Sequence, residues 1–104
     1  MKIEKIQLKE TLPREEEFTF SEKTVQGARV GKKEGAQLII SPRRFKLFSE
    51  GTDIVHILSG SGHFKHARGE TDFSAGESFC LQNAGEYEVN GNCVFLVLRD
   101  QLKQ

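Results

Sequence analysis

The 104-residue sequence predicts an all-β protein, and three of its features support that fold class. Apolar runs are short and recur along the chain, and none keeps a helical spacing over three turns. Ten glycines, spread from Gly27 to Gly91, place turns at short intervals. Short runs between frequent turns fit a sandwich or barrel of antiparallel strands better than alternating strands and helices.

The expected strands follow one another closely, each alternating apolar and polar residues or forming a short apolar run. They span residues 3–8, 18–20, 25–30, 37–40, 45–48, 53–58, 62–67, 71–74, 78–81, 86–89 and 93–99. Residues 13–17 suit either a short helix or an acidic linker, because proline and acidic residues favour the first turn of a helix. Residues 31–35 predict an exposed hairpin loop.

Size and composition predict a single domain, residues 1–104. With 37% hydrophobic and 29% charged residues, the composition is that of a globular protein rather than a disordered chain. Fifteen basic and fifteen acidic residues give a formal net charge of zero, so no nucleic-acid partner is expected. Residues 1–20 are expected to form a strand and an acidic linker, and the strand suits the interface of a homodimer.

No targeting or membrane segment is apparent in this sequence. The N-terminus lacks the apolar core and cleavage site of a secretory signal, so a cytoplasmic location is expected. The longest apolar run, residues 94–98, is far shorter than the roughly 20 residues that span a bilayer. Cys80 and Cys93 lie inside strand-like runs without CxxC spacing, and both are expected to be buried free thiols.

From residue 53 onward the strands are separated by a regular series of glycine turns. A strand ends at Gly60 and Gly62, a hairpin surrounds Gly69, and an Ala-Gly-Glu turn contains Gly76. This order resembles the cupin family over about half of the chain, and the segment GEYEVNG at residues 85–91 is most similar to the C-terminal cupin region of type I mannose-6-phosphate isomerases. The resemblance implies a double-stranded β-helix, or jelly-roll barrel, which agrees with the strand pattern.

Alternation along the later strands predicts which side chains form the wall of the core, because every second residue of a strand points to the same face. The apolar residues at odd positions are Phe73, Phe79, Leu81, Tyr87, Val89, Phe95 and Val97.

The resemblance also implies where a metal would lie, since metal-binding cupins use two histidines, a glutamate and a late histidine. Alignment on Gly60 puts these positions at Leu47, Ser49, Asp53 and either Tyr87 or Glu88. Only Asp53 keeps the chemistry of a metal ligand, so neither a metal nor another cofactor is expected.

A relocated metal site would have to use the three histidines with Glu70. His63 and His66 are three residues apart, so they should point to opposite faces of a strand, and His56 is opposite in parity to Asp53. A β-bulge would reverse this argument, so a relocated site stays an open alternative.

Inward positions predict a pocket at the mouth of the barrel for a small, partly polar organic ligand. The candidate residues are Leu47, Ser49, Asp53, Val55, Ile57 and Tyr87. The alternative is a filled core with Ser49 at the rim and Asp53 in a turn. Arg43, Arg44, Lys46 and Lys65 form either an anion-binding patch or solvated surface charges.

The favoured hypothesis is a binding or regulatory module for a small polar molecule such as a sugar derivative. One alternative is a sugar isomerase or epimerase that uses Asp53 and Tyr87 as base and acid, or a relocated metal. A second alternative is a structural homodimer with a filled barrel. Catalysis is the less favoured interpretation, because fold analogy alone carries little weight for function.

Overall fold

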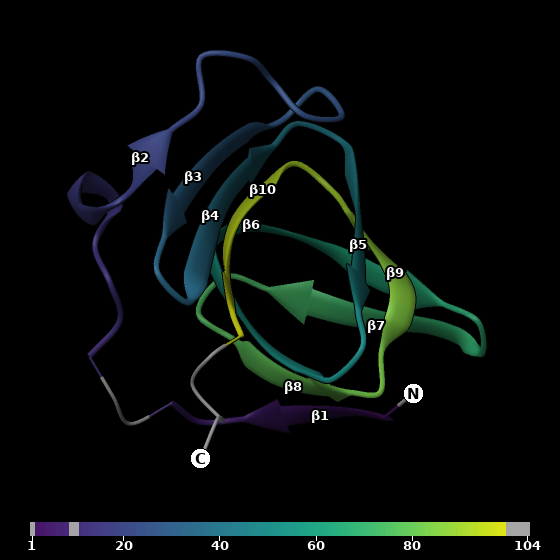
Figure 1. Cartoon of the computed structure of the whole chain (residues 1–104). Helices are drawn as coiled ribbons and strands as arrows, with labels where there is room; N and C mark the ends of the chain where they lie inside the picture. The colour runs from purple at the N-terminus through teal and green to yellow at the C-terminus, as the bar shows by residue number, and fades with distance from the viewer. Residues whose placement is uncertain (1, 9–10, 100–104) are drawn as a thin grey trace.

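The computed structural model describes residues 2–8 and 11–99, shown in colour in Figure 1. Within that part of the chain there are ten strands, all paired antiparallel, and one turn of 3-10 helix. The elements are β1 (Lys2–Ile6), η1 (Glu15–Glu17), β2 (Thr19–Phe20), β3 (Arg29–Lys33), β4 (Ala36–Ser41), β5 (Arg44–Ser49), β6 (Thr52–His66), β7 (Gly69–Ser74), β8 (Ser78–Gln82), β9 (Gly85–Asn90) and β10 (Cys93–Leu98). The predicted all-β class is confirmed.

The strands close into a barrel made of a large and a small sheet. The large sheet has the order β1-β8-β6-β10-β4-β3-β2, and the small sheet joins β5, β9, β6 and β7. In Figure 1 the strands form a ring, with β5 and β9 on the side opposite β4 and β10. This is the jelly-roll arrangement that the sequence predicts. Among the described residues, no helix is long and apolar enough to cross a membrane.

One long strand, β6, passes from the large sheet into the small one. Residues 53–58 and 62–67 were expected to be separate strands joined by a glycine turn, and that prediction is wrong. Gly60, with φ of 86°, and Gly62 instead let the strand bend against the backbone of residues 90–93. The strand therefore lines both walls of the barrel.

Two turns in the first half of the chain are tighter than expected. Residues 25–30 are not one strand, because Gln26 and Gly27 both have positive φ and make a two-residue turn. Val25 and Ala28 exchange both backbone hydrogen bonds across it, each at 2.9 Å. The hairpin loop predicted at 31–35 is also shorter, since β3 continues to Lys33.

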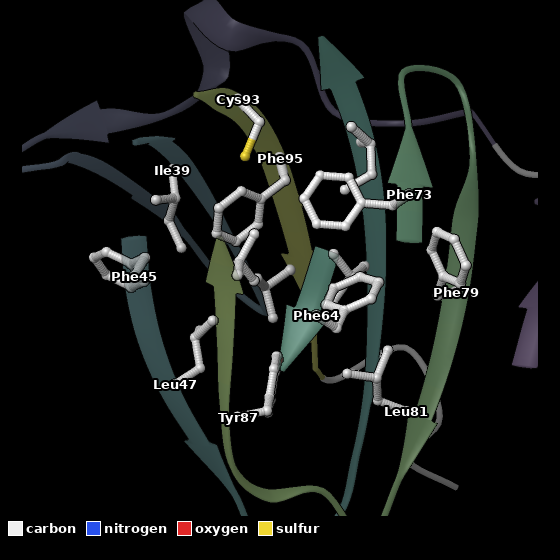
Figure 2. Packing of buried hydrophobic residues seen from close by; sticks show 14 of the residues in the cluster. Ile39, Phe45, Leu47, Phe64, Phe73, Phe79, Leu81, Tyr87, Cys93 and Phe95 are labelled. Carbon is white, nitrogen blue, oxygen red and sulfur yellow. The ribbon is translucent and has the colours of Figure 1, made fainter. Parts of the chain in front are cut away.

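The barrel interior is a single apolar cluster contributed by both sheets. All seven residues predicted to form the core wall lie in it, which confirms that prediction. Figure 2 shows the labelled side chains of this cluster pointing toward one another from strands of both sheets. Phe64 lies at its centre, with ring centroids 4.9 Å from Phe73 and 5.1 Å from Phe79. Such aromatic contacts add to the stabilisation that comes from burial itself.

A second apolar cluster lies on the outer face of the large sheet, where the N-terminal segment covers it. Phe18 packs there against residues of β4, β6 and β10, and Cys80 lies on the same side. Cys80 is half-buried rather than buried, whereas Cys93 is buried as expected, and both are free thiols. The predicted N-terminal strand pairs with β8 of its own chain, from Lys2 opposite Gln82 to Ile6 opposite Ser78. The homodimer stays a prediction.

The bend of β6 predicts an unequal response to two glycine-to-alanine substitutions. A Cβ atom at Gly62 would collide with the carbonyl oxygen of Asn90, so Gly62→Ala should lower the free energy of unfolding by about 3 kcal/mol or more. Gly51 has open space around it and no positive φ, so Gly51→Ala should change stability by less than about 1 kcal/mol. Urea unfolding followed by circular dichroism measures both. Equal stability of the two variants would contradict the tight crossing.

Candidate functional site

The six candidate pocket residues all lie inside the barrel. Each is at most 8% exposed, and Asp53, Val55 and Ile57 are fully buried. Leu47 on β5 is directly opposite Tyr87 on β9, so these two are neighbours in the small sheet rather than facing residues of different sheets. The inward parity is as expected, and Ser49 completes the set at the end of β5. The set therefore lines the barrel interior, with Ser49 and Asp53 nearest the end where β5 finishes and β6 begins.

Asp53 is the centre of a buried hydrogen-bonded group. The Tyr87 hydroxyl donates to its Oδ2 at 2.6 Å. Arg99 donates from Nε to Oδ1 at 3.0 Å and from Nη2 to Oδ2 at 3.2 Å. The same Nη2 donates to the carbonyl oxygen of Phe48 at 3.0 Å. Both carboxylate oxygens are thus engaged, in the two-pronged geometry in which arginine binds carboxylates most strongly.

Arg99 was not among the candidates drawn from the sequence. It follows the apolar run of β10 with the same parity as Phe95 and Val97, which already indicated an inward position. The pairing of Leu98 with Ile54 brings it beside Asp53, and its backbone N–H donates to the carbonyl of Gly35 at 3.0 Å. The parity of the sequence thus indicated the direction of the Arg99 side chain, but its partner Asp53 became clear only from the register between β10 and β6 in the structure.

The environment of Tyr87 keeps the phenol protonated. Burial raises the pKa of Tyr87 well above its usual value of 10, and the negative charge of Asp53 and the hydrogen bond to it raise this pKa further. Arg99 opposes these effects only in part. A phenol with a raised pKa is a weaker acid, so the group serves better as a hydrogen-bond donor than as the proton source of an isomerase.

The three histidines lie apart from this group and from one another. His56 Nδ1 is 2.6 Å from the Ser78 hydroxyl on the outer face of the large sheet, and His63 Nε2 is 3.8 Å from Glu70 on the small sheet. His66 was expected on a hairpin surface, but both of its ring nitrogens are buried without a hydrogen-bond partner. Within residues 2–8 and 11–99, no group of three or more His, Cys, Asp or Glu side chains is placed to hold a metal ion.

A hollow of about 220 Å³ opens at the same end of the barrel. Arg99 is the residue of the buried group that reaches it, and none of the six candidate pocket residues lines it. Lys32, Gln37 and Val97 share the inward parity of their strands and approach the hollow from the barrel side. The full lining is Lys32, Lys33, Gly35, Ala36, Gln37, Val97 and Arg99.

Only part of the predicted basic patch comes together. Arg43 and Arg44 line a second hollow of about 680 Å³. Lys46 and Lys65 instead lie in the small sheet, each opposite Glu88. Lys46 is also 3.7 Å from Glu86, and since both side chains are exposed this is an ordinary surface ion pair.

The chain is similar to known proteins in its fold and not in its sequence. No family model and no curated protein matches this chain. Among solved structures, the mannose 6-phosphate isomerase from Bacillus subtilis matches with a TM-score of 0.59 and 16% identity, over 76% of this chain and 27% of the isomerase. A protein of unknown function from Vibrio parahaemolyticus matches with a TM-score of 0.62 and 14% identity, over 78% of this chain and 96% of that one.

The fold is cupin-like. The structural match falls on the isomerase family whose C-terminal cupin region the sequence resembles, and this chain spans 27% of the length of that isomerase. The cupin alignment assigned four metal-ligand positions to Leu47, Ser49, Asp53 and either Tyr87 or Glu88. In this cupin fold two of those positions, Asp53 and Tyr87, are bonded to each other.

The single tyrosine of the chain, with no tryptophan present, makes the buried group directly observable. Because the pKa of Tyr87 is raised in the folded protein, phenolate absorbance at 295 nm should stay absent at pH values where free tyrosine ionises, near 10. The unfolded chain in guanidinium should titrate normally. Protonation of Tyr87 therefore contributes stability that is fully present below pH 10 and lost as pH rises toward the folded pKa.

Asp53→Asn is the matched comparison for this titration. It removes the negative charge but keeps an oxygen that can accept from Tyr87, so the pKa of the phenol should fall while remaining above 10 because burial persists. A phenol that ionises near pH 10 in the folded wild-type protein would contradict the buried hydrogen bond.

Proposed function

We propose that this cupin-like protein is a binding or regulatory module for a small polar molecule, such as a sugar derivative, held at the mouth of the barrel beside Arg99. The observation that carries the proposal is the hollow at that mouth, where basic and amide side chains converge without an acidic side chain in the lining. Concave sites with a few convergent polar groups are where proteins commonly bind small molecules.

Arg99 has hydrogen-bonding capacity left for such a ligand. A guanidinium carries five N–H donors, and the bonds to Asp53 and Phe48 use Nε and Nη2. No hydrogen bond among the described residues uses Nη1, and the Arg99 side chain is 36% exposed. The buried carboxylate thus fixes the orientation of the guanidinium while its outer N–H groups remain for a ligand at the mouth.

The charges around the hollow favour a ligand that carries a negative group. Lys33 pairs with Glu17 at 3.2 Å, and Arg99 is neutralised by Asp53. Lys32 has no ionic partner within the part of the chain that the structure describes. A volume of about 220 Å³ suits a ligand the size of a monosaccharide, since larger drug-like ligands occupy about 300–1,000 Å³. A sugar acid or sugar phosphate meets both requirements.

Two alternative functions are each favoured by one observation and can each be tested. An isomerase or epimerase is favoured by the fold likeness to a mannose 6-phosphate isomerase, and close to one equivalent of metal in protein purified without a His tag would support it. A structural homodimer with a filled barrel is favoured by the nearly complete burial of the six inward residues. Static light scattering reports the dimer, and the absence of any ligand response would accompany it.

Ligand binding is tested with a panel of sugars, sugar acids and sugar phosphates by thermal shift, followed by calorimetry of the compounds that respond. At least one anionic member should raise the melting temperature. Lys32→Ala should weaken its binding about tenfold, because one charge-assisted contact of roughly 1.4 kcal/mol is lost.

Lys65→Ala is the matched control, since it removes the same charge from the outer face of the small sheet. Its affinity should equal that of the wild-type protein. If no compound in the panel changes the melting temperature, the proposal is wrong. If Lys32→Ala and Lys65→Ala lose the same amount of affinity, the ligand does not bind at the mouth.

A further inference from the structure

At the end of the barrel opposite Arg99, the two-residue turn at Gln26 and Gly27 is docked on the edge of β5. The side-chain amide of Gln26 donates from Nε2 to the Lys46 carbonyl at 3.0 Å and accepts at Oε1 from the Lys46 N–H at 2.8 Å. This pair of bonds imitates a neighbouring strand on the side of β5 that does not face β9. The two-residue turn at Gln26 and Gly27 is thereby held in a fixed place beside the connection from β4 to β5.

That turn forms one wall of the hollow of about 680 Å³. The lining consists of Gln26, Gly27, Pro42, Arg43, Arg44 and Asn90. Consecutive residues of a strand point to opposite faces, but the chain bends at Pro42 and Arg43 before β5 begins, so both arginines reach the same hollow. The Arg43 carbonyl accepts from the Gly91 N–H at 2.7 Å, which fixes the backbone between the two guanidinium groups.

No acidic side chain lines this hollow, so its positive charge is not balanced by its own lining. Arg44 lies opposite Asn90 on β9, and the next outward-facing pair along the two strands places Glu88 opposite Lys46. Neither arginine has an ion-pair partner among residues 2–8 and 11–99. The nearby carboxylate of Glu88 accepts a hydrogen bond from the Asn90 side chain at 3.3 Å.

The turn also offers a backbone donor. Val25 and Ala28 satisfy each other across the hairpin, and no backbone hydrogen bond in the described part of the chain uses the N–H of Gly27. An amide N–H beside two guanidinium groups matches the several acceptor oxygens of a phosphate group. Arginine suits this task better than lysine because its planar fork engages two oxygens at once.

We propose that this hollow is a binding site for the phosphate group of a small phosphorylated molecule, held by Arg43, Arg44 and the N–H of Gly27. The phosphate occupies the charged wall, and the remaining volume accommodates the organic part, since the hollow lies in the size range of about 300–1,000 Å³ that ligand sites occupy. The site lies outside the barrel mouth at Arg99 and stands independently of the function proposed there.

The test is an NMR titration of ¹⁵N-labelled full-length protein with inorganic phosphate at constant ionic strength. The amide signals of Gly27 and Arg44 should shift and saturate with a single dissociation constant. Titration with chloride over the same range should leave Gly27 unmoved. Replacing inorganic phosphate by a hexose phosphate should tighten binding at the same amides.

Variants distinguish specific phosphate binding at this hollow from non-specific attraction to positive charge. The double variant Arg43→Ala and Arg44→Ala should bind phosphate at least tenfold more weakly, while Arg68→Ala, which removes an exposed arginine from the β6–β7 turn, should leave binding unchanged. The double variant Arg43→Lys and Arg44→Lys keeps the charge but loses the forks, and should bind more weakly than wild type.

Each opposite result overturns the proposal. Unchanged affinity in the arginine-to-alanine variant, equal weakening by Arg68→Ala, or shifts confined to Gly35 and Ala36 would each place the phosphate elsewhere. If the alanine variant fails to fold, full phosphate affinity in Arg44→Gln serves as the contradicting outcome.

Discussion

A fully buried carboxylate is the constraint on which this barrel end depends. Asp53 has no exposed surface, and an unpaired charge there would cost several kcal/mol, so its partners are obligatory. Arg99 neutralises it and Tyr87 donates to it. These partners come from β10 in the large sheet and β9 in the small sheet, while Asp53 lies on β6, which belongs to both. One ionic group thus connects both walls of the barrel.

Because this group satisfies its own charges and hydrogen bonds inside the barrel, the side chains free to bind a ligand lie at the two ends of the barrel. Most inward positions are occupied by side chains that bond to one another or pack in the apolar cluster, while the Ser41 hydroxyl is buried without a hydrogen-bond partner among the described residues. Hydrogen-bonding capacity remains at the two ends, where Lys32 and Arg99 line the mouth and Arg43 and Arg44 line the other hollow. Both ends expose basic groups although the chain has no formal net charge, and no acidic side chain lines either hollow.

Strand alternation made much of this arrangement predictable, because the direction of a side chain follows from local parity. It correctly placed Asp53 and Tyr87 inside the barrel with the aromatic wall. Strand alternation could not predict contacts between distant segments. The strand β6 continues through Gly60 and Gly62 because residues 90–93 pack against the bend. Arg99 contacts Asp53 because of the register between β10 and β6. Neither glycine spacing nor composition contains that information.

A double-mutant cycle between Asp53 and Arg99 is the most direct test of the buried group. The free energy of unfolding is measured for the wild type, Asp53→Asn, Arg99→Met and the double variant. Because removing Arg99 alone leaves a buried charge, we expect a coupling free energy above about 1 kcal/mol, moderated by the partial exposure of Arg99. Additive losses, with coupling near zero, would show that the barrel end does not depend on this pair.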